Sequence, residues 1–324
     1  MKAIRIHEFG QSEDVLKYED VPVPEPGSGE VLIKVAAASL NRADLGLRKG
    51  TYRIAADALP VIPGREFAGA IAKLGAGANE FTLGQRVVAY PSLGGYAEFA
   101  VAKTAEVRPI PGGVTFAQAA ALPTASLTAW FGLQTDGDLK SGEWLLVQGG
   151  SSGVGVAAIQ IAKHLGAKVI ATSGSEEKCR KLRKLGADAT IDVSAHDFLA
   201  EVSRVTNQRG VDVVLEMIGG EVYQRSLQTL APGGRLFSIG GAFGAVPDPA
   251  PALTEGRSAT RFSITNYLKA KPEEFPQLDQ ILQLVQAKRF DPGIGKTFPL
   301  AETAAAQRYL EGREHFGKVM LTMG

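Results

Sequence analysis

Cysteine and histidine are both scarce in this chain, and their scarcity limits the sites that it can build. The 324 residues include a single cysteine, Cys179, so no disulfide can form within the chain. The four histidines, at positions 7, 164, 196 and 315, stand far apart in the sequence, whereas a catalytic zinc ion needs about three protein ligands. We therefore predict no metal site. Low cysteine use is typical of the reducing cytoplasm, where we expect the protein to reside.

Long apolar runs and an excess of charge of one sign are missing as well. The amino-terminal sequence MKAIRIHEFG lacks the apolar core of a signal peptide, and no run approaches the roughly 18–20 residues that span a membrane. Lysine and arginine number 35 against 34 acidic residues, a formal net charge of +1. No basic tract is interleaved with aromatic residues. We therefore expect neither a membrane nor a nucleic acid among the partners.

A glycine-rich turn stands near the middle of the chain. Residues 145–166 read LLVQGGSSGVGVAAIQIAKHLG, with an apolar run before the turn and apolar residues at helical spacing after it. Strand, tight turn and helix form the unit that binds a dinucleotide diphosphate, because free N–H groups and the helix dipole point at the anion. Ser152 replaces the middle glycine of G-x-G-x-x-G, and an ordinary turn is the alternative. The predicted diphosphate-binding residues are Gly150, Ser151, Ser152, Gly153, Val154 and Gly155.

The segment after the next apolar run points to the phosphorylated coenzyme. Residues 167–172 predict a second strand, and NAD-binding proteins place a carboxylate at the end of this strand to bind the ribose diol. Here Ser173, Gly174 and Ser175 follow, with Lys178 close behind. Hydroxyls and a cation suit a 2′-phosphate, so we predict NADPH as the coenzyme and these four residues in its site. An ordinary solvated helix charge is the alternative for Lys178, and the glutamates at 176 and 177 count against the phosphate site.

Strands and helices alternate through the rest of this region. Apolar runs at residues 189–192, 211–215 and 234–239 predict strands, with helical segments at about residues 198–206 and 223–230. This alternation predicts an α/β fold with a doubly wound, parallel Rossmann sheet. Ligands of such sheets bind beyond the carboxyl ends of the strands. The predicted coenzyme site therefore includes residues near two further strand ends: Ile218, Gly219, Ile239 and Gly240.

The first 120 residues follow a different pattern. Short apolar segments at residues 31–38, 66–74, 86–90 and 96–101 are separated by glycine and proline, which predicts a mostly antiparallel barrel or sandwich. A helix at about residues 116–132 is expected to lead into the parallel sheet, with the domain boundary near residues 122–128. The chain is long enough for about two domains.

Several short motifs resemble one known family. They are NRAD (41–44), RKGTY (48–52), PGREFAG (63–69), GGYAE (94–98), LPTASLTA (122–129) and GKV (317–319), in addition to the glycine turn. Together they resemble, over essentially the whole chain, the zinc-independent quinone oxidoreductase branch of the medium-chain dehydrogenase/reductase superfamily, which is similar to zeta-crystallin. The resemblance implies a GroES-like, mostly antiparallel β-barrel domain at residues 1–121 and 269–324. It implies a Rossmann dinucleotide-binding domain at residues 122–268.

The resemblance also implies which chemistry is available. Zinc-dependent relatives place Cys and His where this chain has Asn41 and Arg65, so the chain is expected to work without zinc. An alkoxide then loses its usual Lewis acid, whereas hydride addition to a quinone or activated C=C moves charge onto a carbonyl oxygen.

Candidate roles for individual residues follow from the same resemblance. Asn41 and Tyr52 are the candidate catalytic residues, expected near the nicotinamide. Asn41 would bind the coenzyme ribose or the acceptor oxygen, and Tyr52 would bind that oxygen or supply a proton. The alternative for Tyr52 is a loop aromatic that covers an apolar patch. Thr128 and Lys318 are expected to contact the coenzyme. Arg48 is expected to fix its loop through a carboxylate such as that of Asp44.

Residues 261–268 (RFSITNYL) depart from the family pattern. In the superfamily this region forms the last strand of the nucleotide sheet, which often pairs with its twin in a second subunit. An unprotected edge needs covering, so we expect a homodimer. Phe243, Phe262 and Tyr267 are candidates for shaping the acceptor pocket.

Three functions remain open from the sequence. The leading one is an NADPH-dependent quinone reductase that transfers hydride to a small-molecule acceptor, a quinone or an activated alkene. The second is a 2-enoyl-thioester or 2-alkenal reductase, although no cationic cluster for a carrier phosphate is evident. The third, from a different class, is a non-catalytic NADPH-binding or structural protein. The glycine turn and the Asn41 and Tyr52 pair favour an enzyme.

Overall fold

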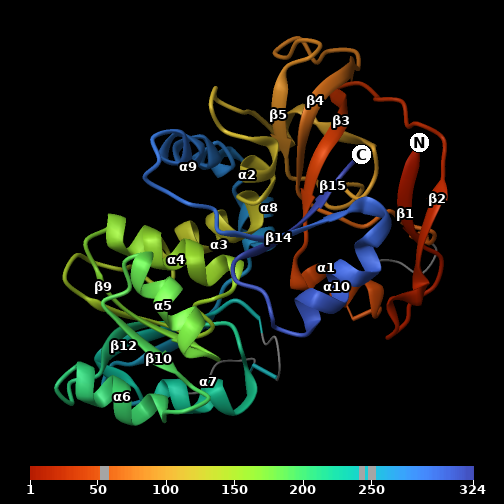
Figure 1. Ribbon diagram of the computed structural model, residues 1–324. Helices are drawn as coiled ribbons and strands as arrows, with labels where there is room; N and C mark the ends of the chain where they lie inside the picture. Colours follow the sequence, from red (N-terminus) through yellow and green to blue (C-terminus); the bar gives the residue numbers. More distant parts are fainter. Residues whose placement is uncertain (52–57, 241–244, 247–252) are drawn as a thin grey trace. The chain divides into compact units, whose positions relative to one another are not determined.

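The chain divides into two compact units, and each is described by itself. The computed structural model describes residues 1–51, 58–240, 245–246 and 253–324 (Figure 1). One unit comprises Met1–Thr124 and Phe275–Gly324, and the other comprises Ala125–Glu274. The first contains the antiparallel sheet and the second the parallel sheet.

The unit 125–274 is built on a parallel sheet of six strands. In chain order these are β8 (Trp144–Val147), β9 (Lys168–Ser173), β10 (Ala189–Asp192), β11 (Val211–Glu216), β12 (Leu230–Ser238) and β13 (Ser258–Arg261). Their order across the sheet is β10-β9-β8-β11-β12-β13, which is the doubly wound order of dinucleotide-binding folds. The predicted fold class is confirmed. The strand order reverses between β8 and β11, and this is where such sheets bind their ligands.

Helices cover both faces of this sheet. α4 (Gly153–His164) and α5 (Glu176–Lys184) lie on one side, while α6 (Phe198–Val205) and α7 (Gly220–Leu227) lie on the other (Figure 1). All residues of β11 are buried, as are all but the first of β9, because a parallel sheet is covered on both faces. Packed between the strands and α6 and α7 are Leu146, Ile170, Phe198, Val214 and Tyr223.

The other unit contains a seven-stranded, mostly antiparallel sheet. Its members are β3 (Glu30–Ser39), β4 (Phe67–Leu74), β5 (Arg86–Ala89), β6 (Phe99–Lys103), β7 (Val107–Pro109), β14 (Ile294–Pro299) and β15 (Lys318–Thr322). The ten-residue β3 pairs with β15, β4 and β6, so residues from both ends of the chain meet along it. β1 (Lys2–Ile6) and β2 (Leu16–Asp20) form a separate antiparallel pair. The helices of this unit include α1 (Arg42–Arg48), α2 (Phe116–Ala120), α9 (Gln277–Gln286) and α10 (Thr303–Glu311).

Two expected elements differ from the structure. The single helix expected at residues 116–132 is two helices, α2 and α3 (Pro123–Gln134). Proline has no N–H to donate and fits the first position of a helix, so the chain begins a new helix at Pro123. The strand expected at residues 261–268 is also wrong. β13 ends at Arg261, and α8 (Ile264–Ala270) follows, with the Ser263 hydroxyl accepting from the Asn266 N–H.

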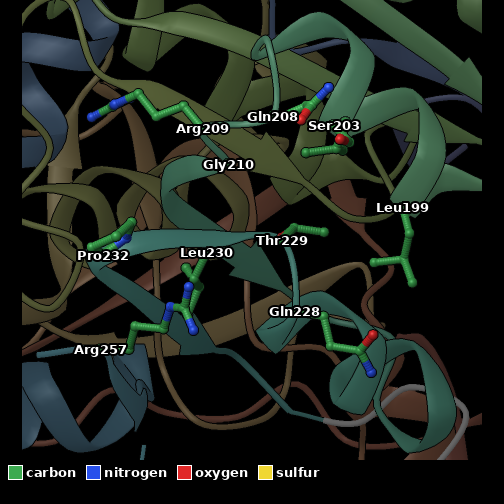
Figure 2. A pocket seen from close by; sticks show the side chains of 11 residues that line it. Leu199, Ser203, Gln208, Arg209, Gly210, Gln228, Thr229, Leu230, Pro232 and Arg257 are labelled. Atoms are coloured by element: carbon green, nitrogen blue, oxygen red, sulfur yellow. The ribbon is translucent and has the colours of Figure 1, made fainter. Parts of the chain in front are cut away.

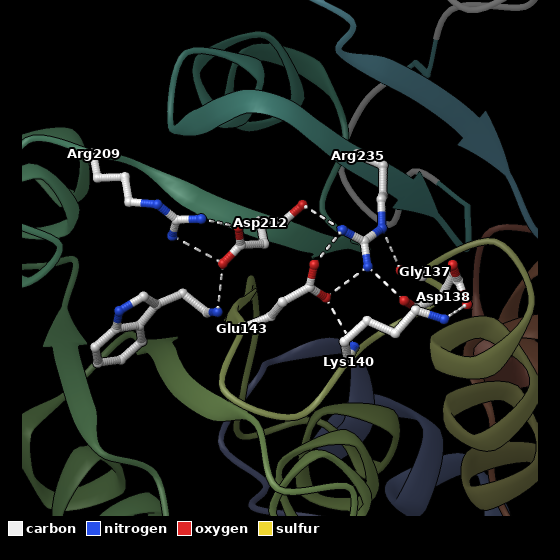
Figure 3. Close-up of polar contacts among 8 residues, drawn as sticks. Gly137, Asp138, Lys140, Glu143, Arg209, Asp212 and Arg235 are labelled. Atoms are coloured by element: carbon white, nitrogen blue, oxygen red, sulfur yellow. Dashed lines mark hydrogen bonds and ion pairs between the residues drawn. The ribbon is translucent and has the colours of Figure 1, made fainter.

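Charged side chains hold together the amino ends of the central strands (Figure 3). Arg235 on β12 donates to both carboxylate oxygens of Glu143, at 2.9 and 2.7 Å. Asp212 accepts from the Trp144 N–H at 2.8 Å and pairs with Arg209. Bidentate pairing of this kind is among the stronger surface interactions, because its geometry is fixed. These contacts lie at the end of the sheet opposite to the carboxyl ends of the strands, where ligands of such sheets bind.

Candidate active site

The predicted coenzyme residues of the unit 125–274 gather at one edge of its sheet. Strand register places Val147 beside Ala171 and Leu215, Asp192 beside Ser173, and Glu216 beside Ser238. The strands are parallel, so their carboxyl ends lie along the same edge. The glycine turn, the Ser173–Ser175 segment, Ile218, Gly219, Ile239 and Gly240 all follow these ends. We call this edge the carboxyl edge.

The glycine turn bends tightly against the neighbouring strand. Gly149 has a φ of +79°, a conformation that glycine adopts without strain. Its N–H donates to the Thr172 hydroxyl at 3.1 Å, and the Gly150 N–H donates to the Thr172 carbonyl at 2.8 Å. A β-carbon on Gly155 would lie 2.6 Å from the carbonyl oxygens of both Gly149 and Gly150. Glycine at 155 is therefore required by the turn itself.

Ser152 explains the imperfect glycine motif. It is the N-cap of α4, and its hydroxyl accepts from the Gly155 N–H at 3.0 Å. The same hydroxyl donates to the Met217 sulfur at 3.0 Å, which links the turn to the segment after β11. The N–H groups of Gly153 and Val154 open the helix and have no acceptor within it. They and the helix dipole make this position suitable for an anion.

A series of hydrogen bonds among three buried polar side chains supports the glycine turn. Thr172 donates its hydroxyl to the Gln148 side-chain oxygen at 2.8 Å, and the Gln148 amide donates to the Ser226 hydroxyl at 2.9 Å. All three side chains are buried. The sequence analysis did not identify them, because each stands in an apolar segment and their contacts join distant strands.

The end of β9 offers hydroxyls and no carboxylate. The Ser173 hydroxyl is buried and has no hydrogen-bond partner among the described residues. Ser175 is the N-cap of α5, and its hydroxyl accepts from the Lys178 N–H at 3.3 Å. Lys178 itself is half-buried. The two nearby glutamates already have partners on their own helix: Glu176 pairs with Arg183 and Glu177 with Lys181.

Glu216 is a buried carboxylate that the sequence analysis missed. It ends β11, and one of its oxygens accepts from the N–H groups of Ile218 at 2.7 Å and Gly219 at 2.9 Å. Burial raises the pKa of this carboxyl, although the two hydrogen bonds act in the opposite direction. These N–H groups therefore donate within the loop. The Ile239 N–H likewise donates to the Glu216 carbonyl, at 3.0 Å.

Thr128 and Gly240 are two further predicted coenzyme residues of this unit. Thr128 is buried on α3, in the same unit as the parallel sheet. Gly240 has a φ of +105°, which only glycine adopts readily.

Tyr52 and Phe243 lie outside the described residues. Phe262 and Tyr267 pack together, with ring centroids 5.7 Å apart, and Tyr267 also stacks on Phe131 at 4.6 Å.

A buried ion pair forms the centre of the candidate site in the other unit. Lys318, at the start of β15, donates to Glu66 at 2.8 Å, and both side chains are almost wholly buried. Glu66 also accepts from the Ser39 hydroxyl, the Asn41 amide and the Thr124 N–H, at 2.7, 2.8 and 2.6 Å. Burial acts to raise the pKa of Glu66, but Lys318 and the other donors outweigh burial and hold this pKa below its usual value.

Both polar atoms of the Asn41 side-chain amide form hydrogen bonds with this ion pair. Its Nδ2 donates to Glu66, and its Oδ1 accepts from the Lys318 ammonium at 2.7 Å. The third ammonium contact is to the Leu40 carbonyl at 3.1 Å. An ammonium has three hydrogens to donate, and all three have acceptors here. Lys318 was predicted to bind the coenzyme, but in the structure its ammonium donates to three groups of its own unit.

The neighbouring polar residues have structural contacts. Asp44 accepts from the Asn41 N–H at 2.7 Å and from the Tyr96 hydroxyl at 2.8 Å, and burial raises the pKa of both Asp44 and Tyr96. Arg48 pairs with a carboxylate, as expected, but the carboxylate is that of Glu311 and not that of Asp44. Arg48 is fully buried and donates instead to Gln307 at 3.0 Å, Glu311 at 3.1 Å and the Gln11 carbonyl at 2.9 Å.

A cavity of about 410 Å³ lies in the unit 125–274 (Figure 2). Gly210, which precedes β11, and Leu230, which begins β12, both line it, so it adjoins the amino ends of these strands. Its two arginines already have partners: Arg209 pairs with Asp212 and Arg257 with Glu255. The cavity therefore does not belong to the carboxyl edge.

The described residues contain neither a metal-binding cluster nor a membrane-spanning helix. No three side chains among His, Cys, Asp and Glu come together there in an arrangement able to bind a metal ion. None of the helices in these parts of the chain is long and apolar enough to cross a membrane.

Two family models match the chain. The model of the alcohol dehydrogenase GroES-like domain matches residues 27–128, and that of the zinc-binding dehydrogenase matches residues 153–283. Combined with the parallel sheet and its glycine turn, these matches define the class of protein as a two-domain oxidoreductase.

Relatives and solved structures narrow this class. The quinone oxidoreductase of Rattus norvegicus is 34% identical over 326 residues, covering 100% of this chain and 98% of that protein. The 2-haloacrylate reductase of a Burkholderia species is 31% identical and covers 98% and 97% of the two chains. The structure of Escherichia coli quinone oxidoreductase complexed with NADPH matches with a TM-score of 0.91 and 27% identity, covering 99% and 100%. The chain belongs to the quinone oxidoreductase family of the medium-chain dehydrogenase/reductase superfamily.

Proposed function

We propose that this protein is an NADPH-dependent reductase of quinones and related conjugated carbonyl compounds that works without zinc. The observation that carries the proposal is the carboxyl edge of the parallel sheet. A tight glycine turn begins α4 there, and the adjacent strand ends in hydroxyls with no carboxylate. Membership of the quinone oxidoreductase family supports the acceptor class.

Three features of the carboxyl edge fit a phosphorylated dinucleotide. Glycine at 150 and 155 lets the turn pack tightly at the start of α4, because a β-carbon at either position would lie 3.0 Å or less from neighbouring protein atoms. The buried Ser173 hydroxyl has no partner among the described residues, and an unpaired buried hydroxyl costs roughly 1–3 kcal/mol unless a ligand satisfies it. Lys178 lies three positions after Ser175, in the first turn of α5. A bound 2′-phosphate would gain a cation there.

These features assign the parts of the coenzyme to named residues. The diphosphate would be held by Gly150–Gly155 through the N–H groups that open α4. The 2′-phosphate would be held by Ser173, Gly174, Ser175 and Lys178, and the nicotinamide end by Thr128, Ile218, Gly219, Ile239 and Gly240. When bound, NADPH supplies the hydride, while the protein orients it. We accordingly propose residues 122–268 as the coenzyme domain and residues 1–121 with 269–324 as the acceptor domain.

Asn41 and Tyr52 are the proposed catalytic residues on the acceptor side. Asn41 is the N-cap of α1 and is only half-buried. One hydrogen on Nδ2 remains available to an acceptor oxygen after Glu66 has taken the other. We propose that Tyr52 binds the same oxygen or donates a proton to it.

The charged groups around Asn41, one of the positions of the lost zinc ligands, favour reduction of a conjugated acceptor. The Lys318 ammonium lies 2.7 Å from Asn41 Oδ1 and 2.8 Å from Glu66 Oε1, where a zinc ion would meet a like charge. Without a Lewis acid the acceptor must spread the developing negative charge over its own carbonyl system. Quinones and enones do so, and simple ketones do not.

The test is the oxidation of NADPH, followed by its near-ultraviolet absorbance, with a quinone, a simple ketone and no acceptor. We expect turnover with the quinone, none with the ketone, and a much slower rate with NADH. Tight NADPH binding with no turnover on any acceptor would replace this proposal by the non-catalytic alternative.

A second candidate acceptor is an activated C=C bond, and one observation favours it. A relative of nearly the same length is a 2-haloacrylate reductase, so this scaffold supports reduction of a conjugated alkene. The same assay with a 2-alkenal, a 2-haloacrylate and a crotonyl thioester compares the three alkenes with the quinone. The acceptor with the highest kcat/KM identifies the favoured class.

A further inference from the structure

Lys318 and Glu66 hold the Asn41 amide in one orientation. Asn41 Oδ1 lies 2.7 Å from the Lys318 ammonium, and Nδ2 lies 2.8 Å from Glu66 Oε1. An ammonium can only donate hydrogen bonds and an ionised carboxylate can only accept them. A flipped amide would put donor against donor and acceptor against acceptor. The chemistry of the two partners thus decides which Asn41 atom faces which way.

Matched polar groups keep Glu66 ionised although it is buried. Glu66 has four donors around its two oxygens, from Ser39, Asn41, Thr124 and Lys318. A carboxylate that accepts hydrogen bonds in this way stays ionised, and it lies 2.8 Å from the Lys318 ammonium. Lys318 is 4% exposed and Glu66 is wholly buried, so water does not weaken their effect on the amide.

We propose that Lys318 is a positioning residue that acts through Asn41, and that it makes the free Asn41 N–H a stronger donor to a ligand oxygen. A cation at the amide oxygen withdraws electron density from the amide nitrogen, because hydrogen bonds in a chain polarise one another. The ligand atom that this site takes is therefore a hydrogen-bond acceptor, such as a quinone carbonyl oxygen or a ribose hydroxyl oxygen. The proposal rests on the assignment of Asn41 to the reaction in the proposed function.

Lys318 therefore has a different role from the coenzyme contact first expected for it. All three of its hydrogens already have acceptors, at Leu40, Asn41 and Glu66. A direct bond from the ammonium to the coenzyme would require one of these buried contacts to break. A positioning role requires no rearrangement.

A double-mutant cycle tests whether Lys318 acts through Asn41. The variants are Lys318→Met, Asn41→Ala and the two combined, with kcat for a quinone and the NADPH Kd, from quenching of intrinsic fluorescence, measured for each. We expect Lys318→Met alone to lower kcat about tenfold, the loss typical of a charge-assisted hydrogen bond, with little change in NADPH Kd. In the Asn41→Ala background, the same change should lower kcat no further. Equal losses in both backgrounds would overturn the proposal, as would a large rise in NADPH Kd with kcat retained.

A matched control separates positioning from stability. Arg48 is another fully buried cation of the same unit, paired with Glu311 and Gln307 and outside the Asn41 cluster. Arg48→Met should lower Tm without lowering kcat per folded molecule. If Lys318→Met fails to fold because Glu66 is left unpaired, Glu66→Gln combined with Lys318→Met removes both charges and must give the same kcat pattern.

An NMR measurement tests the proposal without turnover. The side-chain amide signal of Asn41 is identified by its loss in Asn41→Ala. We expect its protons to shift upfield and to exchange faster with solvent in Lys318→Met or the paired variant. An unchanged signal overturns the proposal. If the unaltered protein oxidises NADPH with none of the acceptors tested, the proposed function fails, and this signal still decides whether Lys318 controls the amide.

Discussion

At the scale of single residues, we expect the charge on Lys178 to decide which coenzyme the carboxyl edge prefers. Lys178 is half-buried in the first turn of α5, and the glutamates beside it are neutralised by Arg183 and Lys181. The nearest uncommitted groups at this strand end are the hydroxyl of Ser173 and the backbone of Gly174. A 2′-phosphate would bring about two negative charges to this place at neutral pH, whereas a ribose diol would bring none.

Lys178→Glu should therefore weaken NADPH much more than NADH. The change replaces an attractive charge by a repulsive one, and we expect the NADPH Kd to rise at least about tenfold, the size of a lost charge-assisted contact. Fluorescence titration with both coenzymes measures it. Lys184→Glu is the matched control, since it makes the same charge change at an exposed position of the same helix. Equal losses for NADPH and NADH in Lys178→Glu would remove the phosphate role.

Glu66 makes the stability of its unit depend on pH. Its pKa in the folded protein lies below the usual 4.5, so the ion pair with Lys318 contributes stability above pH 4.5. That contribution is lost as the pH falls through the lowered pKa and Glu66 takes up a proton. Glu66→Gln leaves a buried cation unpaired, which costs about 3–5 kcal/mol, or a Tm lower by about 10 °C at pH 7.

The Tm difference between Glu66→Gln and the unaltered protein should shrink as the pH falls below 4.5. Differential scanning calorimetry from pH 7 to pH 3 measures it. Glu177→Gln is the control, because Glu177 is exposed and its pair with Lys181 is worth little at any pH. A Tm difference that stayed constant with pH would mean that Glu66 is not ionised in the folded protein.

At the scale of elements, the turn between β8 and α4 is the proposed diphosphate site and is also bonded to the segments on both sides of β8. The Gly149 and Gly150 N–H groups bond to Thr172 on β9, and Ser152 bonds to Met217 after β11. The turn is therefore held by both neighbours of β8 in the sheet. Gly155 carries the tightest contact, because a β-carbon there would overlap two carbonyl oxygens.

Gly155→Ala should disrupt NADPH binding more than it disrupts the fold. The added methyl group would lie 2.6 Å from the Gly149 and Gly150 carbonyl oxygens and would push the turn off α4. We expect NADPH binding to fall below detection by fluorescence titration, with the circular dichroism of the sheet retained. Gly112→Ala is the control, since nothing lies within 4 Å of a β-carbon there and its φ is not positive. Normal NADPH affinity in Gly155→Ala would contradict the assignment of the turn.

Local patterns predicted most of these elements, and the errors have local causes. The strands of the parallel sheet were readable because each is a short apolar run next to glycine. The break between α2 and α3 was also readable, since Pro123 opens a helix more readily than it continues one. Residues 261–268 were assigned by resemblance to a strand, although Ser263 and the apolar spacing after it fit a capped helix.

At the scale of the whole molecule, the contacts that sequence reasoning missed are those between distant residues. Lys318 and Glu66 are separated by 252 positions and meet only because β15 and β4 flank β3. Gln148 and Ser226 are likewise joined across the parallel sheet. No local pattern contains such pairs. The sequence indicated Asn41 and Lys318 as candidates, but the hydrogen bond between them required the fold.

The edge strand β13 carries the last prediction, that the protein is a homodimer. β13 has four residues, and among the described residues it pairs only with β12. The Phe262 N–H donates to the Ser238 carbonyl on β12, so by alternation the Ala259 N–H points away from β12. An open edge of this kind pairs readily with a second copy. Light scattering after size exclusion should give twice the 34.1 kDa of one chain.

Two proline variants of β13 distinguish pairing at this edge from other modes of association. Ala259→Pro removes an outward N–H and leaves the β12 ladder intact, so it should yield a monomer with a nearly normal Tm. Thr260→Pro removes an N–H directed at β12, so it should lower the Tm of the unit 125–274 directly. A dimer that survives Ala259→Pro at micromolar concentration would show that the subunits associate through another surface.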